Sequence, residues 1–112
     1  MFSAKGRAIQ HSADPRDASG RVAAHPAPPV VNQLLQQGQV ICTDVVGNTA
    51  GLLMRVDDGT VTGSVFYATA VDNGPGNKDL AGFLPATESS SCAPGLAPTQ
   101  PVTSGDITVR QY

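Results

Sequence analysis

The chain of 112 residues has no tryptophan, 4% aromatic residues and a single glutamate, Glu88. Charged residues make up only 14% of it, and the formal net charge is −2. A core without large aromatic side chains is packed from Val, Leu, Ile and Ala, so hydrophobic stabilisation at about 25 cal/mol per Å² is modest. The low and negative charge argues against a nucleic-acid-binding protein and against one held on a membrane by basic residues.

Long apolar runs are also missing. No stretch approaches the roughly 20 consecutive apolar residues that a membrane-spanning helix needs. Residues 1–13 contain no apolar segment of the length that an export signal requires. We therefore expect no membrane contact, and a protein that folds in the cytoplasm or leaves it by a route other than a cleaved N-terminal signal.

Groups suited to catalysis or metal binding are scarce. The two histidines, His11 and His25, both lie near the N-terminus, and the two cysteines lack the CxxC or CxxH spacing of a zinc site. The Gly-Pro-Gly at residues 74–76 does not match a phosphate-binding loop, and no nucleophile elbow surrounds the serines at 89–91. These absences predict a protein that is not an enzyme, with no catalytic residues, metal site or cofactor.

Cys42 and Cys92 are 50 positions apart and allow two interpretations. If oxidised, they join a strand to a proline-rich loop and stabilise the fold by about 4 kcal/mol, because a closed loop of that length restricts the unfolded chain. If reduced, as is normal in the cytoplasm, one packs in a strand and the other in a loop. The sequence leaves both interpretations open.

What the sequence does contain is a regular alternation of side chains between residues 39 and 71. Within residues 60–71, odd and even positions fall on opposite sides of an extended chain. Asp57-Asp58-Gly59 separates this run from the apolar residues 52–56, and Asp-Gly between two apolar runs is a strong hairpin signal. The pattern predicts a β-meander at the centre of the fold.

Further strands are expected on either side of this meander. Residues 39–46 begin it, and residues 80–84 and 102–112 follow it. Residues 30–37 favour one or two turns of helix, with the beginning of a strand as the alternative. We therefore expect a mainly β fold: a small antiparallel barrel or sandwich of about five strands, with at most one short helix.

This compact β domain is expected to span residues 31–112, preceded by residues 1–30 as an extended arm. The arm has no sustained apolar period and ends in Pro26-Ala27-Pro28-Pro29, which favours an extended path. It carries four cations and two carboxylates, whereas the remainder has a net charge of −4. The cations are either simply solvated, or they lie on an acidic surface of a neighbouring subunit through Arg7, Arg16 and Arg21.

Tyr112 ends the sequence directly after the last predicted strand. It either completes the edge of the core or packs against another subunit, because aromatic residues are enriched at protein interfaces.

A long, proline-containing arm followed by a compact β domain rich in Gly, Thr, Val and Ala resembles the small head decoration, or cement, proteins of tailed bacteriophages of the lambda type. Those proteins are similar in size and reach over neighbouring capsid subunits with an N-terminal arm. They commonly sit as trimers that stabilise the expanded shell. The likeness is one of layout over the whole chain.

The resemblance implies a structural virion protein, made in the host cytoplasm, that bridges major capsid or other structural subunits. It also implies a homo-oligomer, with a trimer favoured, that binds neither nucleic acid nor membrane. The arm would be the main contact, adding to an exposed strand edge through Val22, Pro26, Pro28 and Val30. Two alternatives stay open: another virion or filament component, such as a tail, connector or pilus-like subunit, and a free-standing β binding module.

Overall fold

The structure, a computed structural model, describes residues 3–25, 36–59, 62–74, 77–102, 105 and 107–111. These residues form eight strands and no helix. The strands are β1 (Ser3–Gln10), β2 (Ala18–His25), β3 (Gln36–Val46), β4 (Thr49–Asp58), β5 (Val65–Val71), β6 (Leu80–Ala86), β7 (Gln100–Pro101) and β8 (Ile107–Gln111).

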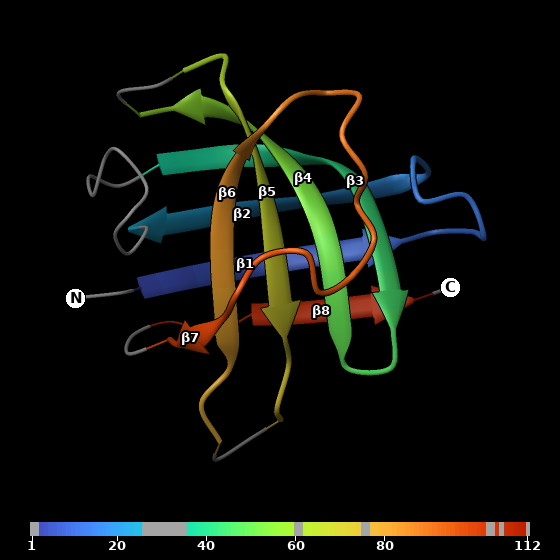
Figure 1. Ribbon diagram of the computed structural model, residues 1–112, viewed down its shortest axis with the longest axis vertical. Helices are drawn as coiled ribbons and strands as arrows, with labels where there is room; N and C mark the ends of the chain where they lie inside the picture. Colours follow the sequence, from blue (N-terminus) through green and yellow to red (C-terminus); the bar gives the residue numbers. More distant parts are fainter. Residues whose placement is uncertain are drawn as a thin grey trace.

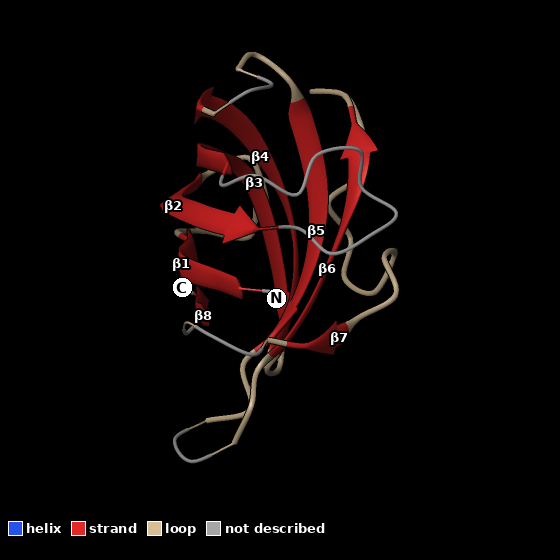
Figure 2. Cartoon of the chain, turned by 90° about the vertical axis from the view of Figure 1, so that its left-hand side faces the viewer, coloured by secondary structure: helices blue, strands red, loops and turns tan. Residues whose placement is uncertain are grey.

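All eight strands belong to one sheet in the order β7-β6-β5-β4-β3-β2-β1-β8. Consecutive strands from β1 to β7 pair antiparallel, and β8 returns to pair parallel with β1. The sheet curls into a half-barrel with two layers. In Figure 1, β1, β2 and β8 form a back layer that crosses behind the front layer of β3 to β6, and Figure 2 shows both layers from the side.

The curl has a local cause in β3 and β4, the longest strands at 11 and 10 residues. Val40 pairs with Met54 and Cys42 with Leu53, so Ile41 has no counterpart in β4 and forms a bulge. A bulge bends its strand and increases the local twist. β3 therefore pairs with β2 through its first residues and follows β4 into the front layer with the rest.

The main core fills the concave side of the half-barrel. Alternate residues of β4 and β5 point inward, where they meet small side chains from β1 and β2. The inward residues include Leu52, Met54, Phe66 and Ala68 of the front layer and Ala4, Ala8, Val22 and Ala24 of the back layer. One enclosed cavity among the described residues of this core has a volume of about 10 Å³, too small for a ligand.

The β class predicted from the sequence is confirmed, but the sheet has eight strands and not about five. Residues 3–25, expected as part of an extended arm, form β1 and β2 of the same sheet. The hairpin they make is fastened to β3, where the buried Gln10 side chain accepts a hydrogen bond of 2.9 Å from the Val45 backbone N–H. β1 and β2 were not predicted because they are rich in glycine and alanine. Neither residue favours a strand, and both weaken the apolar period.

Two smaller expectations also differ. Of the residues considered for a short helix, 36 and 37 begin β3, and the others lie outside the described part of the chain. β7, at residues 100 and 101, lies outside the expected strands, and it pairs with the first two residues of β6.

Candidate protein-binding surfaces

Residues 87–99, which connect β6 to β7, lie across the outer side of the front layer; we call them the covering loop (Figure 1). Two strand residues beneath it are glycines. A Cβ atom on Gly82 would lie 1.8 Å from the Pro98 carbonyl oxygen, and one on Gly51 would lie 2.3 Å from that of Cys92. Since real Cβ contacts are never that short, only glycine at these two positions lets the loop backbone lie directly on the sheet.

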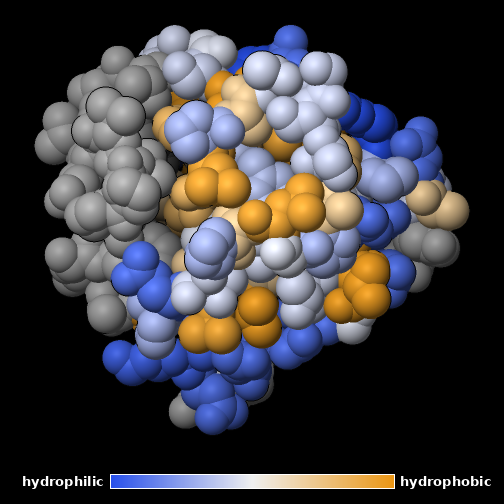
Figure 3. Space-filling model, in the orientation of Figure 1, coloured by the Kyte–Doolittle hydropathy of each residue, from blue (hydrophilic) through white to orange (hydrophobic). Residues whose placement is uncertain are grey.

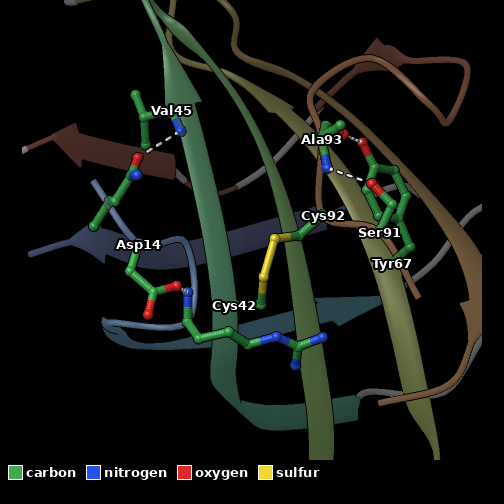
Figure 4. The surroundings of a disulfide bond; sticks show 9 residues. Asp14, Cys42, Val45, Tyr67, Ser91, Cys92 and Ala93 are labelled. Atoms are coloured by element: carbon green, nitrogen blue, oxygen red, sulfur yellow. Dashed lines mark hydrogen bonds between the residues drawn. A yellow bond between two sulfur atoms is a disulfide. The ribbon is translucent and has the colours of Figure 1, made fainter. Parts of the chain in front are cut away.

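A disulfide pins the loop at its centre. Cys42 of β3 is joined to Cys92 with a Cα–Cα distance of 6.2 Å, and the bond spans 50 positions of sequence (Figure 4). An ion pair between Arg55 of β4 and Glu88 holds the beginning of the loop. Of the two interpretations of the cysteines, the structure therefore has the oxidised one, a disulfide between a strand and a loop.

Tyr67 of β5 anchors the second half of the loop. Its hydroxyl donates a hydrogen bond to the Ala93 carbonyl oxygen and accepts one of 3.1 Å from the Leu96 backbone N–H (Figure 4 shows the first). The Thr69 hydroxyl accepts a further bond of 3.0 Å from the Ala97 N–H. These contacts satisfy polar groups of the loop that the sheet would otherwise leave without partners. The loop is thus held by side chains at several points along its length.

The result is a surface with few charges, the front face, which we define by Leu84, Leu96 and the covering loop. Leu84 is 38% exposed and Leu96 52% exposed. Both lie around Tyr67, since Leu84 is its partner in β6 and Leu96 binds its hydroxyl. Figure 3 shows apolar groups in the middle of this side of the molecule and strongly hydrophilic residues toward its margin.

The outer side of the back layer has a different character. Side chains alternate along a strand, so Lys5 and Arg7 of β1 share this outer side. Arg21 of β2 is the partner of Arg7, and Arg110 of β8 pairs with a β1 residue on the same side, so both also lie there. All four are exposed. We call this surface the basic face.

One arginine of the basic face is neutralised within the chain. The Arg21 guanidinium donates two hydrogen bonds of 2.7 Å, one to each carboxylate oxygen of Asp57. The hydrogen bond from Arg21 lowers the pKa of Asp57 below its ordinary value, and the same contact raises the pKa of Arg21. Both side chains are about half exposed, so the pair is a surface interaction of modest energy.

A shallow, open depression of about 780 Å³ lies beside this pair. Arg7 and Arg21 line it from adjacent strands, with Gln39 of β3 and Thr108 of β8 at its sides. Gly6 and Gly20 contribute only backbone to it. The depression therefore presents hydrogen-bond donors from four strands, β1, β2, β3 and β8, to whatever binds there.

Of the residues predicted to contact a partner, the structure brings Arg7 and Arg21 together on the basic face. Arg16 is exposed in the β1–β2 connection. Val22 is a correction: it is buried in the chain's own core, because residues 18–25 are a strand of the sheet. Four other predicted contacts lie outside the described residues: Pro26, Pro28, Val30 and Tyr112.

Sequence reasoning missed the front face altogether. For Leu96 a signal was present, since it is the only large apolar residue in a stretch of Ser, Pro, Gly and Ala. Leu84 gave none, because one more apolar residue in the short run 80–84 is what a buried strand also shows. Tyr67 gave no local signal of its role as the loop's anchor, because that role depends on residues almost 30 positions away.

Two kinds of feature were not found in the described part of the chain: a metal-binding cluster and a membrane-spanning helix. No three His, Cys, Asp or Glu side chains there lie close enough to hold a metal ion. None of its segments is a helix long and apolar enough to cross a bilayer. Comparisons with protein-family models, with curated proteins and with solved structures give no match.

Proposed function

We propose that this protein is a structural component of a virion, a decoration or cement subunit that stabilises the shell by bridging neighbouring capsid subunits. The observation that carries the proposal is the front face, where Leu84 of β6 and Leu96 of a loop pinned by a disulfide and by Tyr67 are exposed on a surface of low charge. The resemblance in layout to phage decoration proteins points in the same direction, although residues 3–25 belong to the sheet.

A pinned loop is suited to this role because binding is weakened by the ordering of flexible segments. Each side chain or loop that is already fixed before association reduces that cost. Depletion of charge and exposure of apolar side chains are typical of the centre of protein interfaces. Leu84 and Leu96 are exposed apolar side chains on a rigid surface with few charges. They replace the extended arm as the proposed main contact.

The disulfide favours a location outside a reducing cytoplasm. Disulfides persist in oxidising surroundings, and virion surfaces are among them. A protein made in the host cytoplasm and then carried on the outside of a particle would form the Cys42–Cys92 bond during or after assembly. We propose that the subunit sits as a homo-oligomer, with a trimer favoured, and that it contacts major capsid or other structural subunits.

The test uses particles purified from the source of the chain and stripped of this protein. The wild-type chain should sediment with them, and the double variant Leu84→Ser, Leu96→Ser should bind about tenfold more weakly, as expected for central apolar contacts. Val46→Ser is the matched control, because Val46 is 63% exposed but lies at the end of β3, outside the front face.

Two results would reject the proposal. One is absence of the chain from purified particles. The other is equal binding by the double variant and the wild type, with both shown to be folded by their melting curves. Images of decorated particles separate shell sites from a tail, connector or filament location.

A further inference from the structure

A second, chemically different surface lies on the opposite side of the molecule. Arg7 and Arg21 occupy directly opposed positions on the antiparallel strands β1 and β2. Like charges at such positions are destabilising, because their side chains leave the sheet side by side. Asp57 offsets this repulsion for Arg21, because its two carboxylate oxygens accept hydrogen bonds from the guanidinium. Among the described residues, the Arg7 guanidinium has no hydrogen bond or ion pair.

The surroundings of Arg7 fit an anion. It lines the open depression of about 780 Å³ together with Arg21, and Gln39 and Thr108 add an amide and a hydroxyl that can donate hydrogen bonds. Lys5 and Arg110 extend the positive charge along β1 and β8, and both are exposed. The face is thus positive on a chain whose formal net charge is −2.

We propose that the basic face binds an acidic segment of a partner protein, with a carboxylate of that segment held by Arg7 in the depression. The chain already contains the geometry of such a contact, since Asp57 meets Arg21 with two parallel hydrogen bonds of 2.7 Å. Arginine forks match carboxylates in this bidentate manner. An Asp or Glu of the partner would accept two hydrogen bonds from the Arg7 guanidinium, as Asp57 does from Arg21.

A protein carboxylate fits this surface better than a nucleic acid. The described part of the face has four cations, and Asp57 with its neighbour Asp58 opposes them at one side. Nucleic-acid surfaces commonly neutralise more phosphates than that, and single strands are also stacked on aromatic side chains. The described residues that line the depression include no aromatic side chain.

The test measures binding of a hexaglutamate peptide to the full-length chain at low ionic strength, by calorimetry or by shifts in NMR spectra. Arg7→Gln should weaken binding about fivefold, the effect of one exposed ion pair. Lys78→Gln is the control, because it removes the same charge from an exposed position in the β5–β6 connection. It should change binding little, and added salt should weaken binding in all three proteins.

A second variant should strengthen peptide binding instead of weakening it. Asp57→Asn releases Arg21 from its internal partner and should tighten hexaglutamate binding by about threefold. A merely structural role of the two arginines would not produce a gain. Affinity that fails to rise in this variant overturns a site that uses both arginines.

Three further results overturn the proposal: no peptide binding by the wild type, equal weakening by Arg7→Gln and Lys78→Gln, or tighter binding of an oligothymidylate of the same charge. The last would assign the face to nucleic acid. Because the assay uses no particles and no front-face variant, its outcome is independent of the proposed function.

Discussion

The Asp79 carboxylate accepts a hydrogen bond of 2.9 Å from the backbone N–H of Ile107, the first residue of β8. Its other oxygen accepts one of 3.0 Å from the Asn73 N–H, and its backbone carbonyl accepts one from Val102. Asp79 is only 5% exposed. One side chain therefore ties the β5–β6 connection to β8, a strand that pairs with β1 and not with β5 or β6.

Asp79→Ala should destabilise the fold by about 3 kcal/mol, because the N–H groups of Asn73 and Ile107 lose their acceptors. Urea unfolding of the variant and the wild type measures the difference. Asp72→Ala is the matched control from the same connection, since among the described residues the Asp72 carboxylate accepts a bond only from the nearby Gly74 N–H. It should cost under about 1 kcal/mol. Equal losses in the two variants would show that closure by Asp79 is unimportant.

Replacing Cys42 and Cys92 together by serine should lower the free energy of unfolding by about 4 kcal/mol, since the closed loop of the unfolded chain is opened. Thermal or urea unfolding measures it. A reductant should destabilise the wild type by a similar amount and leave the double variant unchanged. Two thiols that react with maleimide in the folded, unreduced protein would contradict the disulfide.

Tyr67→Phe should loosen the covering loop without changing the core, because only the hydroxyl is removed. The Ala93 carbonyl and the Leu96 N–H lose their partner, at a cost of about 1–3 kcal/mol. Hydrogen exchange at Leu96 and Ala97 should become faster, while exchange in β4 stays slow. The same variant should bind particles more weakly if a rigid front face is the contact. Unchanged exchange at Leu96 would remove Tyr67 as the anchor.

The Arg21–Asp57 pair predicts a change of stability at acid pH. Its hydrogen bond lowers the pKa of Asp57, so the folded chain binds this proton more weakly than the unfolded chain does. The contribution is therefore complete above the ordinary aspartate pKa of about 3.9 and is lost as the pH falls through the lower, folded value. Urea midpoints of the wild type and Asp57→Asn should differ at neutral pH and converge once the pH is below the folded-state pKa of Asp57. A constant difference would contradict the assignment.

The meander could be predicted from the sequence because strict alternation over many residues has few alternatives to a half-buried strand. Residues 52–56 are half of β4, which continues through Asp57 and Asp58 of the expected hairpin turn, and residues 60–71 contain all of β5. Gly47 and Asn48 form the turn before β4. β1 and β2 escaped prediction for the opposite reason. Their inward side chains are mostly alanine and glycine, which give almost no apolar contrast with their polar neighbours, so only the packed sheet identifies them as strands.

The sequence by itself determined a small β protein with a core of modest aliphatic side chains and few chemically reactive groups, because composition and local alternation depend on neighbouring residues alone. Which distant residues meet was decided by the tertiary structure. The bend in β3 and the path of the covering loop set Cys42 beside Cys92, and β8 returning beside β1 set Ile107 over Asp79. Contacts between distant positions depend on strand order and register, which local patterns do not specify.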